Sequence, residues 1–310
     1  MPLKKDGPNL SVELGPLILR NPVIAASGTF GYGEEYAGII PLKCLGALIT
    51  KGLSPEPSRG TPPPRLAETP SGMLNAIGLE NVGVEAFLRE KMPFLRRAGC
   101  SVLVNIFGCV EEEYAEMARR LSDVEGIAGL EANISCPNVK AGGTIFATEA
   151  KAVYQVTSKI RQATSSFLMV KLSPNVGDIV KIATAAEEAG ADAISLINTL
   201  TGMAVNIKTR TPVLANITGG LSGQAIKPIC LRMVWQVAQT VRIPVVGIGG
   251  ITTAEDALEY LIAGAAAIQV GSAHFIDPRA SLKIIDGIQG YLKANRLSSV
   301  SSLVGSLKVG

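Results

Sequence analysis

The sequence is poor in histidine and cysteine. It contains one histidine, His274, and five cysteines, which stand at positions 44, 100, 109, 136 and 230 without a CxxC pair or a repeated spacing. Metal centres, Ser/His hydrolases, disulfide frameworks and iron–sulfur clusters each need several such residues at defined spacings. We therefore expect no metal site, no iron–sulfur cluster and no disulfide in this chain.

Long apolar runs and long charge runs are also missing. The longest uncharged stretch, residues 260–276, contains Gln269, Ser272, His274 and two glycines, which makes it too polar for a transmembrane helix. The first 15 residues carry two lysines with no apolar segment behind them, so we expect no secretory signal and a cytoplasmic location. The 29 Lys and Arg residues are nearly balanced by 26 Asp and Glu residues and form no basic run, so neither nucleic acid nor a membrane is an expected partner.

What the sequence does contain is a repeated pattern of short apolar segments. Eight segments rich in β-branched residues are each followed by Gly, Asn, Ser or Lys and then by a stretch with helical periodicity. They are residues 22–26, 47–50, 101–106, 129–133, 167–172, 193–198, 244–248 and 267–270. Segments this apolar on both faces are typical of buried parallel strands. The eight strand–helix units predict an α/β fold, a (β/α)8 TIM barrel in which residues 1–310 form a single domain.

The segments between the predicted strands complete this picture. Ahead of the first strand, residues 11–21 have the pattern of a short hairpin that turns at Gly15 and Pro16, and we expect it to close the amino end of the barrel. Two connections, residues 52–82 and 199–224, are too long for simple loops and leave the carboxyl ends of strands, so we expect them to cover an active site. The predicted helices are residues 84–98, 111–121, 149–163, 176–189, 226–240, 254–263 and 279–294.

Residues at the ends of the predicted strands, or just after them, should converge at the carboxyl-end face of the barrel. They are Ser27, Gly28, Thr29, Lys51, Gly52, Asn105, Asn133, Ser135, Cys136, Lys171, Asn198, Thr199, Gly249, Gly250, Gly271 and Ser272. This set of amides, hydroxyls, two lysines and one thiol contains no carboxylate, which argues against glycosidase-type chemistry. It suits a planar, carbonyl-rich and anionic ligand.

Glycine clusters among these residues indicate a phosphate site. Backbone N–H groups at Gly249, Gly250 and Gly271 can approach a phosphate closely, and the GGLSG sequence of residues 219–223 can add a third wall. Any one of these glycines could instead only make a tight turn, but their expected convergence favours phosphate binding. Residues 247–252 lack the last glycine of the GxGxxG fingerprint, so we expect no Rossmann-type NAD site.

Cys136 and two lysines are the candidate reactive groups. A lone thiol is usually a small buried hydrophobe, but Cys136 follows a strand end in the sequence NISCPN, where a deprotonated thiol can act as a general base. Lys51 and Lys171 each end a strand, and a lysine there could form a Schiff base, as in aldolases. Together with a phosphate site and a thiol, the two lysines favour a flavin as the ligand. A cation stabilises the anionic form of the reduced flavin ring. For His274 we expect a packed or surface-capping role and no part in catalysis.

Longer motifs follow one another in the order of a known family. They are ASGTFGYG, ITKG, ETPSGMLNAIGLEN, VNIFG, NISCPNVKAGG, VKLSPN, LINT, ITGGLSGQAIKP, GIGGI and VGSA. In these motifs the sequence resembles the cytosolic class of dihydroorotate dehydrogenases over nearly its whole length. MLNAIGLEN and SCPNVKAGG are more similar to the NAD-linked (B-type) branch than to the fumarate-linked branch, and the cysteine differs from the serine base of the membrane-bound branch.

The resemblance implies a TIM barrel that binds FMN and oxidises dihydroorotate to orotate in pyrimidine biosynthesis. Cys136 would remove a proton from C5 while a hydride passes from C6 to FMN. The implied FMN contacts are Ser27, Lys51, Gly52, Asn105, Asn133, Lys171, Ile197, Gly223, Gly249, Gly250, Gly271 and Ser272. The implied substrate contacts are Lys51, Asn75, Ala76, Ile77, Gly78, Leu79, Asn133, Asn198 and Thr199. Two positions depart from the family pattern: Ile217, where Gly or a polar residue is usual, and His274, where Asn is common.

The same resemblance implies a partner protein. The NAD-linked branch pairs its catalytic subunit with an electron-transfer subunit that carries FAD and a [2Fe–2S] cluster, in a heterotetramer of two chains of each kind. A fumarate-linked single-subunit enzyme is the nearest alternative. A tRNA dihydrouridine synthase-like barrel would need a basic surface or an added RNA-binding domain, and a net charge of +3 over 310 residues supplies neither. A Schiff-base lyase that uses Lys171 would be colourless, and a non-catalytic flavin-carrying subunit would not need the thiol and the asparagines.

Overall fold

Eight parallel strands close into a barrel in the computed structural model, which describes residues 7–134 and 148–309. Around the barrel the strand order is β10-β15-β16-β3-β4-β7-β8-β9. The strands are β3 (Val23–Ala25), β4 (Ala47–Ile49), β7 (Ser101–Ile106), β8 (Gly129–Asn133), β9 (Leu168–Leu172), β10 (Ala193–Leu196), β15 (Val245–Ile248) and β16 (Ala267–Val270). Each lies within one of the eight predicted segments, which confirms the (β/α)8 TIM barrel.

The barrel strands are buried on both faces. Every residue of these strands is buried except Ser101 at the start of β7. Strands that are covered by helices outside and by packed side chains inside have no solvated face, so their sequences contain few polar residues. The polar residues that do interrupt them, such as Glu131 in β8 and Gln269 in β16, therefore indicate a specific role.

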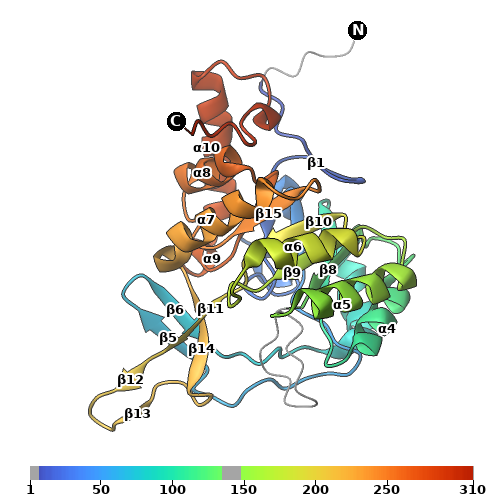
Figure 1. Cartoon of the computed structure of the whole chain (residues 1–310), viewed down its shortest axis with the longest axis vertical. Helices are drawn as coiled ribbons and strands as arrows, with labels where there is room; N and C mark the ends of the chain where they lie inside the picture. Colours follow the sequence, from blue (N-terminus) through green and yellow to red (C-terminus); the bar gives the residue numbers. More distant parts are fainter. Residues whose placement is uncertain (1–6, 135–147, 310) are drawn as a thin grey trace.

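Helices cover the outside of the barrel. The long ones lie close to the predicted bounds: α4 (Glu111–Leu121), α5 (Ala150–Ala163), α6 (Ile179–Glu188), α7 (Lys227–Ala238), α8 (Ala254–Ala263) and α10 (Ala280–Ala294). The short ones are α1 (Glu34–Ala37) and α9 (Ala273–Ile276), with 3-10 turns at Leu42–Cys44, Gln224–Ile226 and Val300–Ser302. Figure 1 shows α4, α5 and α6 on one side of the barrel and α7, α8 and α10 on another. Within residues 7–134 and 148–309, no helix combines the length and the apolar character needed to span a membrane.

The single helix expected over residues 84–98 is broken into three parts. α2 (Gly83–Ala86) and α3 (Met92–Leu95) flank a π-helical turn at Phe87–Lys91. The reason is Pro93, the second residue of α3, whose ring nitrogen has no hydrogen to donate to the preceding turn. The chain continues through a wider π turn, with hydrogen bonds five residues apart, and the apolar side chains of the segment stay buried.

A hairpin closes the amino end of the barrel, as the sequence predicted. β1 (Val12–Leu14) and β2 (Leu17–Leu19) pair antiparallel around Gly15, whose φ of +57° favours glycine. The side chains of Leu14 and Leu19 belong to the main core. Gly15 lies against the backbone of Asp192, which is the residue that precedes β10. The hairpin is therefore packed under the barrel.

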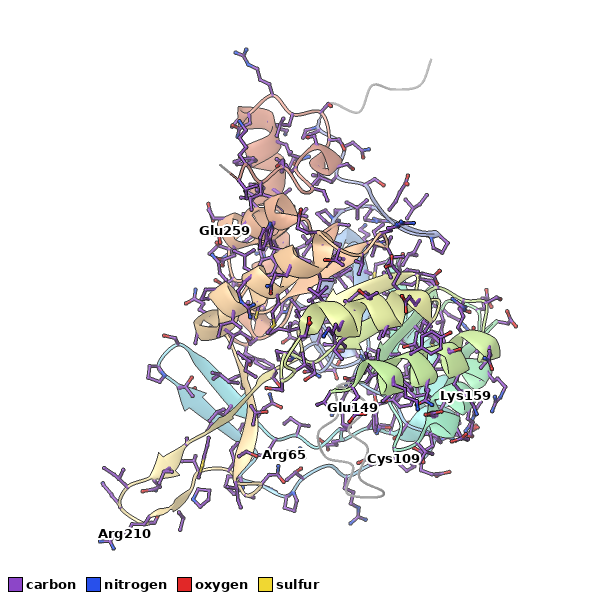
Figure 2. All side chains as sticks on the ribbon, viewed as in Figure 1. Arg65, Cys109, Glu149, Lys159, Arg210 and Glu259 are labelled. Atoms are coloured by element: carbon purple, nitrogen blue, oxygen red, sulfur yellow. The ribbon has the colours of Figure 1, made fainter. Side chains whose placement is uncertain are left out.

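The two long connections form a second sheet instead of irregular loops. Its strands are β5 (Leu66–Thr69), β6 (Gly72–Asn75), β11 (Leu200–Met203) and β14 (Thr218–Ser222), in the order β11-β14-β6-β5. A further hairpin of β12 (Val205–Asn206) and β13 (Thr211–Pro212) projects from this sheet, with Arg210 near its tip (Figure 2). The sequence did not reveal these strands because Asn75 pairs with Gly220, which is 145 residues away. Glycine-rich strands also have little β propensity of their own.

If the amino-end hairpin is an integral part of the barrel, removal of one of its buried side chains must destabilise the whole domain. We expect Leu14→Ala to lower the free energy of unfolding by roughly 2–5 kcal/mol, because Leu14 is fully buried. Ile18→Ala is the matched control and should change it by only about 0.5 kcal/mol, because Ile18 is 65% exposed. Urea unfolding followed by circular dichroism measures both. Equal effects would show that the hairpin does not pack on the barrel.

Candidate active site

A cavity of about 480 Å³ opens at the carboxyl ends of the barrel strands. The predicted site residues that line it are Ser27, Lys51, Gly52, Asn75, Ala76, Ile77, Gly78, Leu79, Asn105, Asn133, Lys171, Ile197, Asn198, Thr199, Gly223, Gly249, Gly250, Gly271 and Ser272. Cys136 is the one remaining predicted residue, and it lies outside the described residues. The structure brings the others together, and the binding role of each stays a prediction.

Six asparagines line the cavity, and four of them form hydrogen bonds that tie its wall together. Nδ2 of Asn198 donates to Oδ1 of Asn133 over 3.3 Å, which joins the ends of β10 and β8. Asn75 on β6 donates its Nδ2 to a backbone carbonyl of β14 at 3.2 Å. Asn175, which the strand-end pattern did not reveal, donates to the backbone carbonyl of Thr199 at 3.1 Å. Because an amide carries both donors and an acceptor, this set suits a ring with neighbouring N–H and C=O groups.

The two predicted lysines have different environments. Lys171 on β9 is buried, and its Nζ lies 3.3 Å from Oγ of Ser27. Lys51 is partly exposed, and its Nζ lies 3.5 Å from Oε2 of Glu80, which also pairs with Arg65 at 2.7 Å. The positive charge of Lys51 is the main cause that lowers the pKa of Glu80. Glu80 lines the cavity but belongs to the long connection after β4, so a search of strand ends could not find this carboxylate.

The glycine pair after β15 leaves room for an anion. Gly249 and Gly250 have φ values of +122° and +69°, a region that favours glycine. A Cβ added to Gly249 would collide with Sγ of Cys230, and one added to Gly250 would meet Cβ of Lys227 at 2.6 Å. Only bare backbone therefore fits between α7 and the cavity. Such a turn lets backbone N–H groups approach a phosphate.

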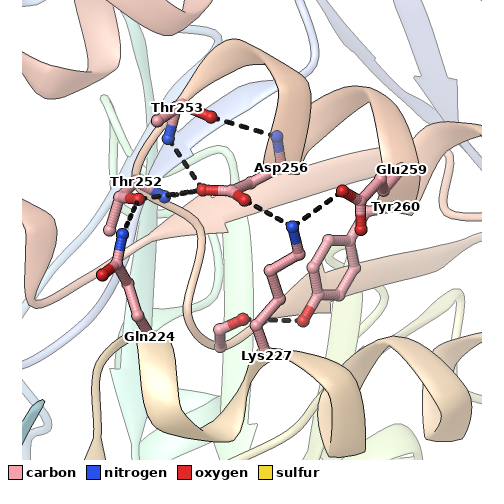
Figure 3. Close-up of polar contacts among 8 residues, drawn as sticks. Gln224, Lys227, Thr252, Thr253, Asp256, Glu259 and Tyr260 are labelled. Atoms are coloured by element: carbon pink, nitrogen blue, oxygen red, sulfur yellow. Dashed lines mark hydrogen bonds and ion pairs between the residues drawn. The ribbon is translucent and has the colours of Figure 1, made fainter. Parts of the chain in front are cut away.

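A polar network holds this glycine turn in place (Figure 3). The hydroxyl of Tyr260 donates to the carbonyl of Gly249 at 2.6 Å. One oxygen of Asp256 accepts the backbone N–H groups of residues 252–253 at 2.9 and 3.0 Å, and the other accepts from Nζ of Lys227 at 2.5 Å. Burial opposes the ionisation of Asp256, but these hydrogen bonds outweigh it and lower the pKa of the carboxyl. The turn is thus held in one conformation before any ligand binds.

Comparison with known proteins agrees with this geometry. The sequence profile of the dihydroorotate dehydrogenase family matches residues 9–292. The chain belongs to the dihydroorotate dehydrogenase family. It is 58% identical over 300 residues to the dihydroorotate dehydrogenase B (NAD(+)), catalytic subunit, of Geotalea uraniireducens, which covers 97% of this chain and 98% of that protein. It is also 58% identical over 302 residues to the protein of the same description from Geobacter metallireducens, with 97% and 99% covered. The resemblance inferred from the motifs is confirmed.

The sequence analysis did not predict two polar residues of the barrel strands as site residues. Gln269 of β16 lines the cavity, and Glu131 of β8 accepts a hydrogen bond from it at 2.7 Å. The signal for both was present in the sequence. A carboxylate or an amide within an otherwise apolar buried strand needs a hydrogen-bond partner, and the barrel interior is the place to look for it.

The two departures from the pattern of the dihydroorotate dehydrogenase family have structural consequences. Ile217 has a φ of +66°, which glycine adopts without strain, and its side chain is 56% exposed. His274 is buried, which confirms the expected packing role, and its ring lies edge-on to Phe30 with centroids 4.8 Å apart. Its two nitrogens contact the Gly271 carbonyl at 3.2 Å and the Ser281 hydroxyl at 2.8 Å. Burial lowers the pKa of His274 to about 4.

The lowered pKa of His274 makes the stability of the chain depend on pH. The unfolded chain binds a proton below the ordinary imidazole pKa of about 6.5, whereas the folded chain resists it down to about 4. The contribution of neutral His274 to the free energy of unfolding is therefore complete above pH 6.5. It declines by roughly 3 kcal/mol as the pH falls from 6.5 to about 4. Urea unfolding of the wild type and of His274→Asn across this range should show a shallower decline in the variant. If the free energies of unfolding of the two proteins changed with pH in parallel, the lowered pKa of His274 would be contradicted.

Proposed function

We propose that this protein oxidises dihydroorotate to orotate with FMN, as the catalytic subunit of an NAD-linked dihydroorotate dehydrogenase in pyrimidine biosynthesis. The observation that carries the proposal is the meeting, in one cavity, of glycine turns, a buried lysine and a group of asparagines. Relatives that share more than half of its residues bear the description dihydroorotate dehydrogenase B (NAD(+)), catalytic subunit. The site chemistry and the relatives support the same reaction.

The residues of the cavity suit FMN. Oε1 of Gln269 is buried and has no hydrogen-bond partner among the described residues, as expected of an acceptor that a ligand N–H group completes. We assign Gly223, Gly249, Gly250, Gly271 and Ser272 to the phosphate. We assign Ser27, Lys51, Gly52, Asn105, Asn133, Lys171 and Ile197 to the rest of the cofactor. When bound, FMN supplies the acceptor for the hydride that leaves C6 of dihydroorotate.

The substrate is assigned to the asparagines and to Lys51. The residues are Lys51, Asn75, Ala76, Ile77, Gly78, Leu79, Asn133, Asn198 and Thr199. The asparagines offer donors and acceptors to the dihydropyrimidine ring, which fixes its orientation. Lys51 offers a positive charge to the substrate carboxylate. Arg65 lies 2.7 Å from Glu80, so it can still compensate that carboxylate when Lys51 turns toward the substrate.

We propose Cys136 as the base that removes the proton from C5 of the substrate. It stands outside the described residues, three positions after Asn133 at the end of β8. The described cysteines are less suitable, because none of them lines the cavity. Burial also raises the pKa of Cys230 to about 12 and that of Cys100 to about 11, which keeps both thiols protonated near neutral pH.

Absorption spectroscopy tests this reaction. The purified chain should show flavin absorption, and anaerobic dihydroorotate should bleach it. Cys136→Ser should keep its flavin, but its flavin should be reduced about 100-fold or more slowly near neutral pH, because a hydroxyl is a much weaker general base than a thiolate. Raising the pH should restore part of the reduction rate. Stopped-flow absorbance gives the rates. A colourless protein would favour the Schiff-base lyase, and equal rates would exclude Cys136 as the base.

Electrons must then leave the reduced site. The name of the relatives, a catalytic subunit, supports a second subunit here as well. We propose that this partner carries FAD and a [2Fe–2S] cluster and that two chains of each kind form a heterotetramer. The glycines after β15 belong to a barrel turn, so they offer no Rossmann-type NAD site. In the same proposal residues 1–310 act as one domain, in the cytoplasm.

The need for a partner predicts how the isolated chain behaves. Purified alone, it should oxidise dihydroorotate with an artificial dye as acceptor but form little NADH, because it lacks a route from FMN to NAD. Steady-state assays with dye, NAD and fumarate in parallel measure this. Robust NADH formation by the FMN-only chain would refute the need for a partner. Efficient turnover with fumarate would place the protein in the fumarate-linked branch.

A further inference from the structure

A carboxylate lies in the centre of the barrel, below the cavity. Glu131 on β8 is fully buried, and donors from three other strands reach its two oxygens. Nδ2 of Asn105 on β7 donates to Oε2 at 2.7 Å. Nε2 of Gln269 on β16 and Oγ of Ser195 on β10 donate to Oε1 at 2.7 and 2.9 Å. The reaction proposed above does not use Glu131.

Two of these partners connect Glu131 to the cavity. Asn105 and Gln269 belong to the cavity lining, whereas Glu131 and Ser195 do not. Glu131 stands two residues before the cavity-lining Asn133 on the same strand, so both side chains point to the inner face of the barrel in successive layers. Any influence of Glu131 on a ligand therefore passes through the two amides or through its charge.

The carboxylate decides which end of each amide faces the cavity. An ionised carboxylate only accepts hydrogen bonds, so Asn105 and Gln269 turn their NH2 groups toward it. Their carbonyl oxygens then face other directions. Oδ1 of Asn105 lies beside Gly52 of the cavity wall, where an added Cβ would be 2.8 Å away. Oε1 of Gln269 is the buried acceptor that has no partner among the described residues. The floor of the cavity thus presents acceptors.

The charge of Glu131 has a counterpart in Lys171. On β9, Lys171 is in register with Asn133 of β8 on one side and with Ser195 of β10 on the other. Both charged residues are buried in the barrel. A buried carboxylate is tolerated when several donors compensate it, which is the arrangement found here. Lys171 stands on the neighbouring strand, two residues beyond the level of Glu131, so the barrel interior holds one residue of each charge type.

We propose that Glu131 is a positioning residue of the FMN site. It holds the amides of Asn105 and Gln269 with their oxygens toward the cavity, where they offer acceptors to the N–H and hydroxyl groups of FMN. Its negative charge makes reduction of the bound flavin less favourable than it would be if Lys171 were the only charged residue in the barrel interior. This inference rests on the FMN-dependent function proposed above and assigns a role to a residue that touches neither cofactor nor substrate.

Glu131→Gln separates this role from simple packing. Glutamine has nearly the same shape, but it replaces one acceptor oxygen with an NH2 group. Whichever side this NH2 takes, it faces the NH2 of Asn105 or that of Gln269, and that amide must turn over and present a donor to the cavity. We expect the dissociation constant for FMN to rise about tenfold or more, which corresponds to about 1.4 kcal/mol. The reduction potential of the bound flavin should become more positive.

Ser195→Ala is the matched control. It removes the third donor to Glu131, leaves both amides paired with the carboxylate, and changes a residue outside the cavity lining. It should change the dissociation constant for FMN by less than about threefold, even where it lowers stability. Fluorescence titration of the flavin-free protein gives the affinity, and equilibration with redox dyes gives the potential. Equal losses of affinity in the two variants would assign Glu131 a packing role and overturn the proposal.

Two further variants keep the test decisive. Glu131→Gln combined with Asn105→Asp exchanges amide and carboxylate, so an oxygen again faces the cavity, and FMN affinity should return to within about threefold of the wild type. If Glu131→Gln does not fold, Gln269→Leu keeps the carboxylate but removes one acceptor oxygen of the cavity floor together with one of the three donors to Glu131. It should weaken FMN binding about tenfold. If the double variant did not regain FMN affinity, or if Gln269→Leu bound FMN as tightly as the wild type, the proposal that the amide oxygens of Asn105 and Gln269 face FMN would be contradicted.

These outcomes also separate the inference from the proposed function. A wild-type chain that binds no flavin, or whose flavin dihydroorotate does not reduce, would refute the proposed function. A wild-type chain that binds FMN and is reduced by dihydroorotate, while Glu131→Gln keeps the same affinity and potential, would refute only the role of Glu131.

Discussion

Closure of the parallel barrel is the constraint on which the rest of the structure depends. Its strands are only three to six residues long, and such short strands gain stability only when each is paired on both sides and covered by helices. The pairing of β16 with β3 joins the two ends of the sheet, so no strand edge is left open. Because all eight strands run in the same direction, their carboxyl ends meet at one rim. Ser27 and Ser272, which are far apart in the sequence, thereby line the same cavity.

Three ionisable groups inside this apolar frame are tolerated because each has hydrogen-bond partners. Glu131 receives three donors, and Asp256 receives Lys227 and the backbone N–H groups of residues 252–253. His274 remains neutral between a carbonyl and a hydroxyl. An unpaired buried polar group costs on the order of 1–3 kcal/mol, so these networks have few alternative arrangements. The same rigidity that satisfies the buried groups also holds the site residues in position before a ligand binds.

The second sheet extends the barrel site beyond its strand ends. β6 and β14 bring Asn75 and the glycines of residues 219–223 to the cavity, and the connection after β6 brings Glu80 to Lys51. The cavity lining thus combines groups from the barrel rim with groups from an added layer. The family assignment agrees with this arrangement, since the match extends over residues 9–292 and so includes both long connections.

The sequence by itself determined the barrel, the positions of all eight strands and the set of strand-end residues, because buried parallel strands and the turns that follow them are encoded locally. Only the tertiary structure decided the second sheet, the break at Pro93 in its π-helical form, and the partners of Glu80 and Glu131. The GLEAN segment shows that a carboxylate is buried, but not that its partners come from β7, β10 and β16. Those contacts join residues up to 138 positions apart, and a local pattern carries no information about which distant strand closes against it.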